Sequence, residues 1–584
     1  MTNALLCVDN LRVAYPYQRG GVGAGDRAIQ WAVDDVSFTL NPGERLGLVG
    51  ESGCGKSTLG RAVMRLMPTG TQIEGTVRFN DRNVFDFNPE ELRRFRGEAV
   101  SIVFQDPMTR LDPLMTIGDH CLETLLAHEP TLTKAKAKEK AIATLEAVNI
   151  PASRWAQYPH EFSGGMRQRV AIALALLLNP KLIVADEPTT SLDVTVSAQI
   201  LKELTRLCHE RNMALLMISH DLALVGEYCD RIAVMYNGKF VETGATTNVL
   251  QQPQHAYTQS LLQAALHIQV DPSAPSVLTQ ANLSESESDM AIANSSALPN
   301  VATAPLSNHG EAPLLRLEHL CKHYTLEQNF LTRLLAKQET NTIKAVDNIT
   351  LNIYPGEILG LVGESGCGKS TLSRTILQLI PSTSGRVEFL GNDITRLSRQ
   401  DLQKQRRHMQ MVFQDPHACL NPLMTVGDSI ADPLHIHGLA DGAEAKRQAL
   451  AMLEKVGLTP ADEFYQRYPG DLSGGQQQRV AIARALITQP KLVICDEPVS
   501  MLDASVQSQV LELMLDLKRE FNLTYLFITH DLWLARYLCD RIAVMNAGQI
   551  VELGATREIF NHPQHPYTQT LLAAAPLLTK QAAQ

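Results

Sequence analysis

Short apolar runs alternate with helical patterns along this 584-residue chain. The runs "RLGLVG" (45–50) and "ILGLVG" (358–363) predict buried strands, each followed by a helix that begins at a lysine. "KLIVADE" and "KLVICDE", and "ALLMISHD" and "TYLFITHD", predict further buried strands. This alternation is typical of α/β domains with mostly parallel sheets. The stretches "TKAKAKEKAIATLEAV" and "EAKRQALAMLEKV" are rich in helix formers and predict a small helical subdomain in each half.

The pattern occurs twice because the sequence contains two copies of one unit. "GLVGESGCGKSTL" stands at 47–59 and again at 360–372, and "CDRIAVM" at 229–235 and 539–545. The serine of "SGG" precedes the aspartate of "DEP" by 23 residues in both halves (186−163 and 496−473). A repeat of this length predicts a duplicated domain rather than a solenoid. We expect one domain at 1–266 and a second at 313–584.

Residues 267–312 are expected to tether the two domains. The segment is rich in Ser, Ala, Asn and Pro and has no aromatic residue, a composition that predicts disorder. A flexible chain of this length reaches roughly 35–40 Å, which lets two domains meet face to face.

Composition narrows the class of protein. The net charge of −10 offers no positive field for nucleic acid. The start of the chain does not read as a signal peptide, and no segment is long and apolar enough to span a bilayer. The ten cysteines include no CxxC pair, which argues against a disulfide framework or a zinc site and fits a reducing cytoplasm. If the protein works at a membrane, other chains must supply the span.

Two glycine-rich loops fit the pattern GxxxxGK[ST]. Such loops turn backbone N–H groups toward phosphates at the start of a helix. The lysines would reach the β- and γ-phosphates, and Ser57 and Ser370 would hold Mg²⁺. One match could be a chance turn, but two matches that each follow a buried strand favour nucleotide binding. The candidate ATP-binding residues are Gly50, Glu51, Ser52, Gly53, Cys54, Gly55, Lys56, Ser57, Thr58, Gly363, Glu364, Ser365, Gly366, Cys367, Gly368, Lys369, Ser370 and Thr371.

Acidic pairs end two of the predicted strands. Asp186 and Asp496 are placed to bind Mg²⁺, and Glu187 and Glu497 to polarise an attacking water. An Asp-Glu pair alone is more often a solvated strand end. Its position downstream of a phosphate loop favours the catalytic interpretation.

Two further motifs point to anion contacts. The "SGG" sequences (Ser163, Gly164, Gly165 and Ser473, Gly474, Gly475) precede helices, where a simple cap and a second phosphate site are equally good interpretations of one copy. His220 and His530 close apolar strands, where a histidine is usually structural. Each follows its glutamate by 33 residues (220−187 and 530−497), which favours a γ-phosphate contact.

Together these motifs resemble two ATP-binding-cassette (ABC) ATPase domains in one chain. The resemblance adds Q-loop glutamines that contact Mg²⁺ (Gln105, Gln414) and D-loop aspartates (Asp193, Asp503). It implies ATP and Mg²⁺ as cofactors, and an α/β fold whose parallel core carries an antiparallel β region and a helical subdomain. In this family two cassettes pack head to tail. One site would therefore join Lys56, Glu187 and His220 to Ser473–Gly475, and the other Lys369, Glu497 and His530 to Ser163–Gly165.

Departures from the family pattern are confined to a few positions. The second signature reads "LSGGQ", whereas the first has Phe162 and Met166, and Ser191 and Met501 precede the two D-loop "LD" pairs. Neither half has lost its lysine, glutamate or histidine. We expect two hydrolytic sites, of which the one containing Met166 is the candidate for slower turnover.

The resemblance also suggests tyrosines for adenine stacking. Tyr15 and Tyr324 lie upstream of the phosphate loops, where related cassettes place an aromatic ring. Either could equally be an ordinary core or surface tyrosine.

Two motifs resemble the ATP-binding subunits of peptide/nickel-class ABC importers. They are "FQDPMTRLDPLMTIGD" with "FQDPHACLNPLMTVGD", and "PQHAYTQSLL" with "PQHPYTQTLL". The resemblance implies a peripheral subunit on the cytoplasmic face of the inner membrane. Its partners would be two permease subunits and, through them, an extracytoplasmic solute-binding protein. We expect no nucleic-acid partner, because the net charge is negative. We expect no iron–sulfur cluster, because no cysteine follows Cys539.

Two alternatives stay open at this point. A soluble tandem ABC factor acting on the ribosome fits the lack of spans, although the acidic charge and the uncharged tether disfavour it. A fused sugar-importer ATPase usually carries one degraded site, and neither site here is degraded. The transported solute could be a peptide, glutathione, nickel or another small molecule.

Overall fold

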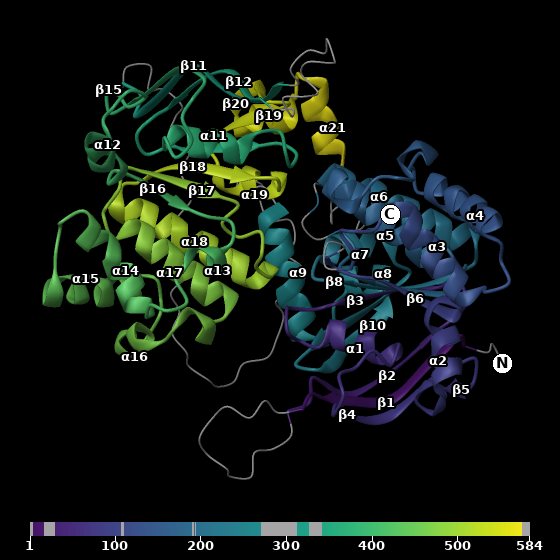
Figure 1. Cartoon of the computed structure of the whole chain (residues 1–584). Helices are drawn as coiled ribbons and strands as arrows, with labels where there is room; N and C mark the ends of the chain where they lie inside the picture. Colours follow the sequence, from purple (N-terminus) through teal and green to yellow (C-terminus); the bar gives the residue numbers. More distant parts are fainter. Residues whose placement is uncertain are drawn as a thin grey trace.

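The computed structural model describes residues 4–16, 30–106, 110–189, 192, 194–269, 312–325 and 342–574. Two halves of similar architecture lie side by side (Figure 1). The predicted tether lies almost wholly outside the described residues. The first-half strands are β1 (Leu6–Ala14), β2 (Val33–Leu40), β3 (Arg45–Val49), β4 (Gln72–Phe79), β5 (Arg82–Asn83), β6 (Val100–Val103), β7 (Leu182–Asp186), β8 (Ala214–Ser219), β9 (Arg231–Tyr236) and β10 (Lys239–Ala245). The second-half strands are β11 (Leu315–Thr325), β12 (Thr342–Ile353), β13 (Ile358–Val362), β14 (Ser384–Phe389), β15 (Asn392–Asp393), β16 (Met409–Val412), β17 (Leu492–Asp496), β18 (Thr524–Thr529), β19 (Arg541–Asn546) and β20 (Gln549–Ala555).

The helices follow the same duplicated order. The first half has α1 (Lys56–Val63), α2 (Pro89–Arg94), α3 (Ile117–His128), α4 (Lys134–Ala147), α5 (Gly164–Leu176), α6 (Val194–Glu210), α7 (Leu222–Tyr228), α8 (Thr246–Gln251) and α9 (Ala256–Gln269). The second has α11 (Lys369–Ile376), α12 (Arg399–Arg406), α13 (Pro416–Cys419), α14 (Val426–Ile436), α15 (Gly442–Lys455), α16 (Ala461–Gln466), α17 (Gly474–Leu486), α18 (Ala504–Phe521), α19 (Leu532–Leu538), α20 (Thr556–Asn561) and α21 (Pro566–Ala574). The helices α1 and α11 begin at the predicted lysines.

Each half contains two sheets of the same topology. The six-stranded sheets have the orders β10-β9-β3-β8-β7-β6 and β16-β17-β18-β13-β19-β20, and only the β9–β10 and β19–β20 pairs are antiparallel. The four-stranded sheets β2-β1-β4-β5 and β12-β11-β14-β15 are antiparallel. This confirms the expected fold class of a mostly parallel core with an antiparallel β region.

The large sheet has two apolar faces because its side chains alternate along each strand. In β7, Leu182 and Val184 pack with α1 and the small sheet, whereas Ile183 and Ala185 pack with the helices of the other face. This packing covers the two faces of the sheet and not the carboxyl ends of its strands. The phosphate loop follows one of these ends. Parallel strands commonly bind ligands at this edge.

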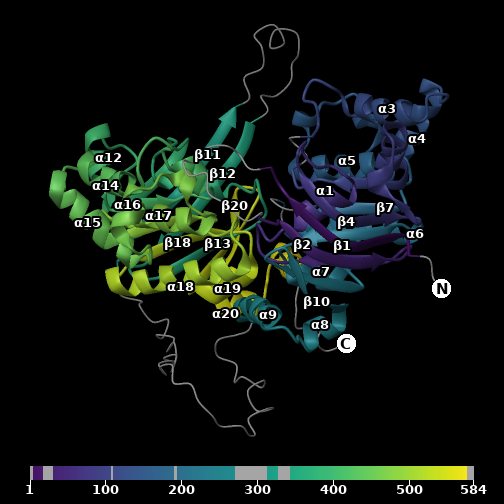
Figure 2. The same ribbon diagram turned by 90° about the horizontal axis from the view of Figure 1, so that it is seen from below.

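The two halves are joined by an exchange of C-terminal helices. Helix α9 of the first half packs on α18 and α19 of the second, and α21 of the second half packs on α6 of the first. In Figure 1, α9 lies between the halves and α21 extends from the second half toward α6, and Figure 2 shows α9 beside α19 from another direction. Among the described residues, we find no helix long and apolar enough to cross a membrane.

Candidate nucleotide-binding site

The two phosphate loops have nearly identical geometry. Gly55 and Gly368 precede the helices with φ of 108° and 110°. A Cβ at either position would lie 2.1 and 2.0 Å from the carbonyl oxygens of Ala32 and Ala345, so only glycine fits. The loops thus bend tightly at the N-terminus of a helix, where the helix dipole favours an anion.

Each loop lysine is folded onto its own loop. Lys56 Nζ donates to the carbonyl oxygens of Gly50 (2.6 Å) and Glu51 (2.8 Å), and Lys369 Nζ makes the matching bonds to Gly363 (2.6 Å) and Glu364 (3.0 Å). Both lysines are only 5% exposed. The ammonium groups are therefore held inside the loops, where they satisfy carbonyl groups until a phosphate is present.

Hydroxyl and carboxylate oxygens meet beside each loop. Ser57 Oγ donates to Asp186 Oδ1 at 2.8 Å, and Ser370 Oγ to Asp496 Oδ1 at 3.2 Å. Burial raises the pKa of both aspartates, and the serine hydroxyl groups oppose this rise. Paired hard oxygen donors with a desolvated negative charge are the ligand set that Mg²⁺ prefers, so these residues fit that ion.

In the first half, Glu187 is held by two partners. Gln105 Nε2 donates to its Oε2 at 2.8 Å, and His220 Nδ1 lies 3.2 Å from its Oε1. This contact raises the pKa of His220, although burial opposes the rise. Glu187 has a φ of 47°, a left-handed conformation that a non-glycine residue adopts at a cost. The backbone strain and the two partners together aim the carboxylate.

The second half repeats this arrangement. Gln414 Nε2 donates to Glu497 Oε2 at 2.9 Å, His530 Nδ1 forms an ion pair with Oε2 at 3.1 Å, and Glu497 has a φ of 49°. Burial alone would raise the pKa of Glu497, but His530 holds it below its usual range. Burial likewise opposes the charged form of His530, and Glu497 outweighs it, so the pKa of His530 is raised. Glu497 is therefore ionised at neutral pH, as an acceptor of a proton from water must be.

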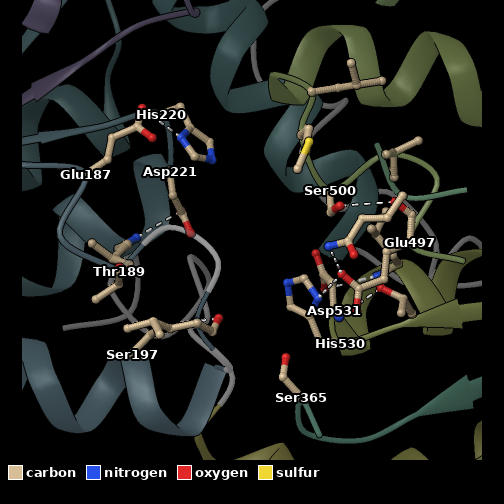
Figure 3. A pocket seen from close by; sticks show the side chains of 18 of the residues that line it. Glu187, Thr189, Ser197, His220, Asp221, Ser365, Glu497, Ser500, His530 and Asp531 are labelled. Carbon is tan, nitrogen blue, oxygen red and sulfur yellow. Dashed lines mark hydrogen bonds and ion pairs between the residues drawn. The ribbon is translucent and has the colours of Figure 1, made fainter. Parts of the chain in front are cut away.

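A cavity of about 1000 Å³ lies between the halves. The cavity is lined by residues of the second phosphate loop, within 365–371, and by Gly164, which belongs to the first signature. Both glutamate–histidine pairs border the cavity, as Figure 3 shows from close by. Residues of the second phosphate loop and Gly164 of the first signature thus border the same cavity, and the composite site that contains Lys369 stays a prediction.

The first phosphate loop, which contains Lys56, is joined to the second half by hydrogen bonds. The Ser52 N–H and hydroxyl groups both donate to Asp503 Oδ1, at 2.7 and 2.8 Å. Reciprocally, the Thr195 hydroxyl donates to the Glu364 carboxylate. Each phosphate loop therefore contacts the segment that follows the acidic strand end of the opposite half. Lys56 and Ser473–Gly475 are not among the described residues that line the cavity. Asp193 and Ser191 lie outside the described residues.

The two signatures differ at the helix start. Ser473 and Gln476 form a reciprocal cap, with Ser473 N donating to Gln476 Oε1 (3.0 Å) and Gln476 N donating to Ser473 Oγ (3.4 Å). Met166 occupies the corresponding place in the first half, and Ser163 makes no such side-chain cap. Phe162 is buried like its counterpart Leu472 and replaces one apolar side chain by another.

The predicted adenine tyrosines are both exposed. Tyr15 is 42% exposed and its hydroxyl lies 3.1 Å from Thr58 Oγ1, beside the first phosphate loop. Tyr324 is 39% exposed, with the Lys322 ammonium 5.0 Å from its ring centroid. Their exposure leaves room for a stacked base.

Two further tyrosines contact the phosphate loops and were not predicted to do so. The Glu51 N–H donates to Tyr257 Oη at 3.2 Å, and the Glu364 N–H to Tyr567 Oη at 3.1 Å. Both tyrosines belong to the repeated "PQHxYTQ" motif. The exact recurrence of that tyrosine was the only available signal, because about 200 residues separate it from the loop.

Two phosphate loops, two aimed glutamates and an interface that joins opposite halves define a tandem nucleoside-triphosphate-binding protein. The family model described as "ABC transporter" matches residues 33–190 and 346–500. The family model described as "Oligopeptide/dipeptide transporter, C-terminal region" matches residues 241–286 and 551–584. The chain belongs to the ABC transporter family, within its oligopeptide/dipeptide class, and is an ATP-binding, ATP-hydrolysing import subunit.

Relatives match along nearly the whole chain. The glutathione import ATP-binding protein GsiA of Escherichia coli (strain K12) is 41% identical over 98% of this chain and 90% of the relative. GsiA of Shigella dysenteriae serotype 1 gives the same values. A solved dimeric ATP-binding cassette in a post-hydrolysis state bound to ADP and Pi is 32% identical, with a TM-score of 0.37, and covers 42% of this chain and 99% of that one. Nothing in these comparisons supports the ribosomal alternative.

Proposed function

We propose that the chain hydrolyses Mg²⁺-ATP at two composite sites, each built from the phosphate loop of one half and the signature of the other. The observation that carries this proposal is the cavity between the halves, which is lined by Lys369 and Ser370 of one half and by Gly164 of the other. The reciprocal contacts Ser52–Asp503 and Thr195–Glu364 support the same head-to-tail pairing.

The residues of each half would share the chemistry. Lys56 and Lys369 exchange their loop carbonyl partners for phosphate oxygens. Glu187 and Glu497 accept a proton from the attacking water, while the adjacent histidines hold these carboxylates and reach the γ-phosphate. When Mg²⁺ is bound at the serine–aspartate pairs, it supplies positive charge to the phosphate oxygens.

Single replacements of the glutamates test whether both sites work. Glu187→Gln and Glu497→Gln keep the shape of the side chain but remove the base, so each should abolish turnover at one site. We expect each variant, in the complete transporter, to retain partial ATPase activity and the double variant to retain almost none. A variant with unchanged turnover, paired with one that has none, would show that a single site does all the work.

The pairing of loop and signature has its own test. In the Glu187→Gln background, only the Lys369 site remains active, so Ser163→Ala should lower turnover much more than Ser473→Ala. In the Glu497→Gln background the order should reverse. If each serine instead affects the site of its own half, the sites are not composite.

We further propose that this chain drives a peptide-class importer from the cytoplasmic face of the inner membrane, with two permease subunits and a solute-binding protein as partners. Glutathione is the first solute to test, because GsiA carries that function in its name. Extraction of the tagged chain in mild detergent should recover two integral-membrane proteins. Recovery of ribosomal proteins without a permease would contradict the importer assignment. Glutathione uptake that is lost in the double glutamate variant would identify the solute.

A further inference from the structure

A mixed sulfur, nitrogen and oxygen cluster lies on the antiparallel sheet of the second half. Cys321 and His323 are two residues apart on β11 and share one face of that strand, and Asp347 lies on the neighbouring strand β12. One ligand atom from each residue lies within 4.8 Å of both others. Irregularities in the β11–β12 register flank the cluster, and such bulges re-aim side chains.

Around the cluster, Asp347 Oδ1 and His323 Nε2 face each other, whereas Cys321 Sγ donates to the His319 carbonyl at 3.6 Å. Lys344 Nζ and Gln549 Nε2 both approach Asp347 Oδ2, at 3.3 and 3.1 Å, whereas Oδ1 faces His323. The buried Nε2 atom of His323 has no hydrogen-bond partner among the described residues. The Asn348 N–H donates to Cys321 Sγ at 3.2 Å, a contact that orients a thiolate ligand.

In the first half, an arginine balances the charge of the aspartate that corresponds to Asp347. Aligning "LRVAY" (11–15) with "LCKHY" (320–324) and "AVDD" with "AVDN" pairs Arg12 with Cys321 and Asp34 with Asp347. In the first half, Arg12 Nε lies 3.0 Å from Asp34 Oδ1. The second half has lost this guanidinium and carries a thiol and an imidazole instead. The exchange replaces the guanidinium by two groups that can bind a metal ion, while Lys344 still contacts the other carboxylate oxygen of Asp347.

The separation of the nitrogen and oxygen ligand atoms suits a tetrahedral metal ion. Zinc bonds of about 2.0–2.1 Å to nitrogen and oxygen place those two atoms roughly 3.3–3.4 Å apart in a tetrahedron. The observed separation of His323 Nε2 and Asp347 Oδ1 is 3.4 Å. The side chains of His323 and Asp347 are 24% and 18% exposed and His323 Nε2 itself is buried, so the cluster lies just below the surface, where water can supply a fourth ligand.

We propose that Cys321, His323 and Asp347 form a zinc-class metal site that clamps β11 to β12. Binding releases the thiol proton of Cys321 to solvent, and the thiolate and carboxylate then balance the charge of a divalent ion. No CxxC pair marks the site because its ligands come from two strands. The proposal is independent of the ATPase assignment, since none of the three residues belongs to the phosphate loops.

Cobalt titration of the full, reduced chain tests the site, with Mg²⁺-ATP present in excess. Co²⁺ bound to a thiolate gives a near-ultraviolet charge-transfer band, and tetrahedral Co²⁺ gives intense visible bands. We expect one equivalent of Co²⁺, displaced by one equivalent of Zn²⁺. Cys321→Ser should abolish the charge-transfer band, and His323→Ala should weaken binding about ten-fold or more.

Cys7→Ser is the matched control, because Cys7 is half-buried on the equivalent strand β1 but contacts Asp9 and Arg78 instead of a histidine. It should leave the titration unchanged. Zinc should also raise the melting temperature of the wild type and not that of His323→Ala, which gives a second readout if Cys321→Ser fails to fold. A charge-transfer band that survives in Cys321→Ser, or none in the folded wild type at micromolar Co²⁺, would overturn the proposal.

Discussion

Replacing Tyr567 with phenylalanine would remove one hydroxyl group from the C-terminal motif and leave the ring in place. That hydroxyl accepts the Glu364 N–H at 3.1 Å, and the carbonyl of the same Glu364 holds the Lys369 ammonium at 3.0 Å. Tyr567 also belongs to α21, which packs on α6 of the first half. The tyrosine therefore links the second phosphate loop to the interface between the halves.

The magnitude follows from one partly buried hydrogen bond. Such a bond contributes about 0.5–1.5 kcal/mol net, because water can replace part of it. If the loop must be ordered to bind phosphate, the loss appears in ATP affinity as a factor of roughly 2 to 13. The global fold should be little affected, because the ring keeps its packing.

The assay is equilibrium binding of ATP to a chain that carries Glu187→Gln and Glu497→Gln, so that hydrolysis does not interfere. Tyr465→Phe is the matched control. Its hydroxyl donates to Asp428 Oδ1 at 3.0 Å in the helical subdomain, away from the phosphate loops. It should lower stability by a similar amount without changing ATP affinity.

Unchanged ATP affinity in Tyr567→Phe, with the protein folded, would refute the positioning role. An equal loss of affinity in Tyr465→Phe would show that general destabilisation, rather than loop order, explains the effect.

Three further predictions concern the asymmetry, the charges and the interface. Met166→Gln should restore the reciprocal cap that Gln476 makes in the other half and stabilise α5 by about 0.5–1 kcal/mol. In the Glu187→Gln background it should also raise turnover, and unchanged turnover would mean that the cap does not limit this site. Because the pKa of His530 is raised in the folded protein, this histidine contributes its full stabilisation below its ordinary pKa of 6.5 and loses it as the pH rises through the folded-state pKa. His530→Gln should therefore lower the melting temperature more at pH 6 than at pH 8.5. The opposite trend would contradict the ion pair with Glu497. Asp503→Ala removes both cross-interface bonds to the first phosphate loop and should weaken the contact between the halves, measured as a several-fold loss of ATPase with an intact melting temperature.

Features encoded within a few consecutive residues were predictable. The phosphate loops and the helices that start at Lys56 and Lys369 follow from glycine conformations and local helix geometry, which no distant contact has to supply. The buried strands before them were equally visible, since continuous apolar runs are typical of parallel strands covered on both faces. Duplicated spacing suggested a γ-phosphate contact for His220 and His530, whereas the contact of His220 with Glu187 was found only in the structure.

Features built from residues far apart in the chain required the tertiary structure. The Tyr567–Glu364 bond, the exchange of α9 and α21, and the convergence of Cys321 and Asp347 depend on how sheets and helices pack, and local sequence patterns carry no information about that packing. The two signatures differ at two positions in sequence, yet only the structure shows that Met166 costs the first half a helix cap whereas Phe162 stays buried like Leu472. The sequence by itself determined two cassettes and their chemistry, because these rest on local backbone geometry. Only the tertiary structure shows the contacts that join the halves, Ser52 with Asp503 and Thr195 with Glu364, because these pairs lie 451 and 169 residues apart in the chain and no local pattern links them.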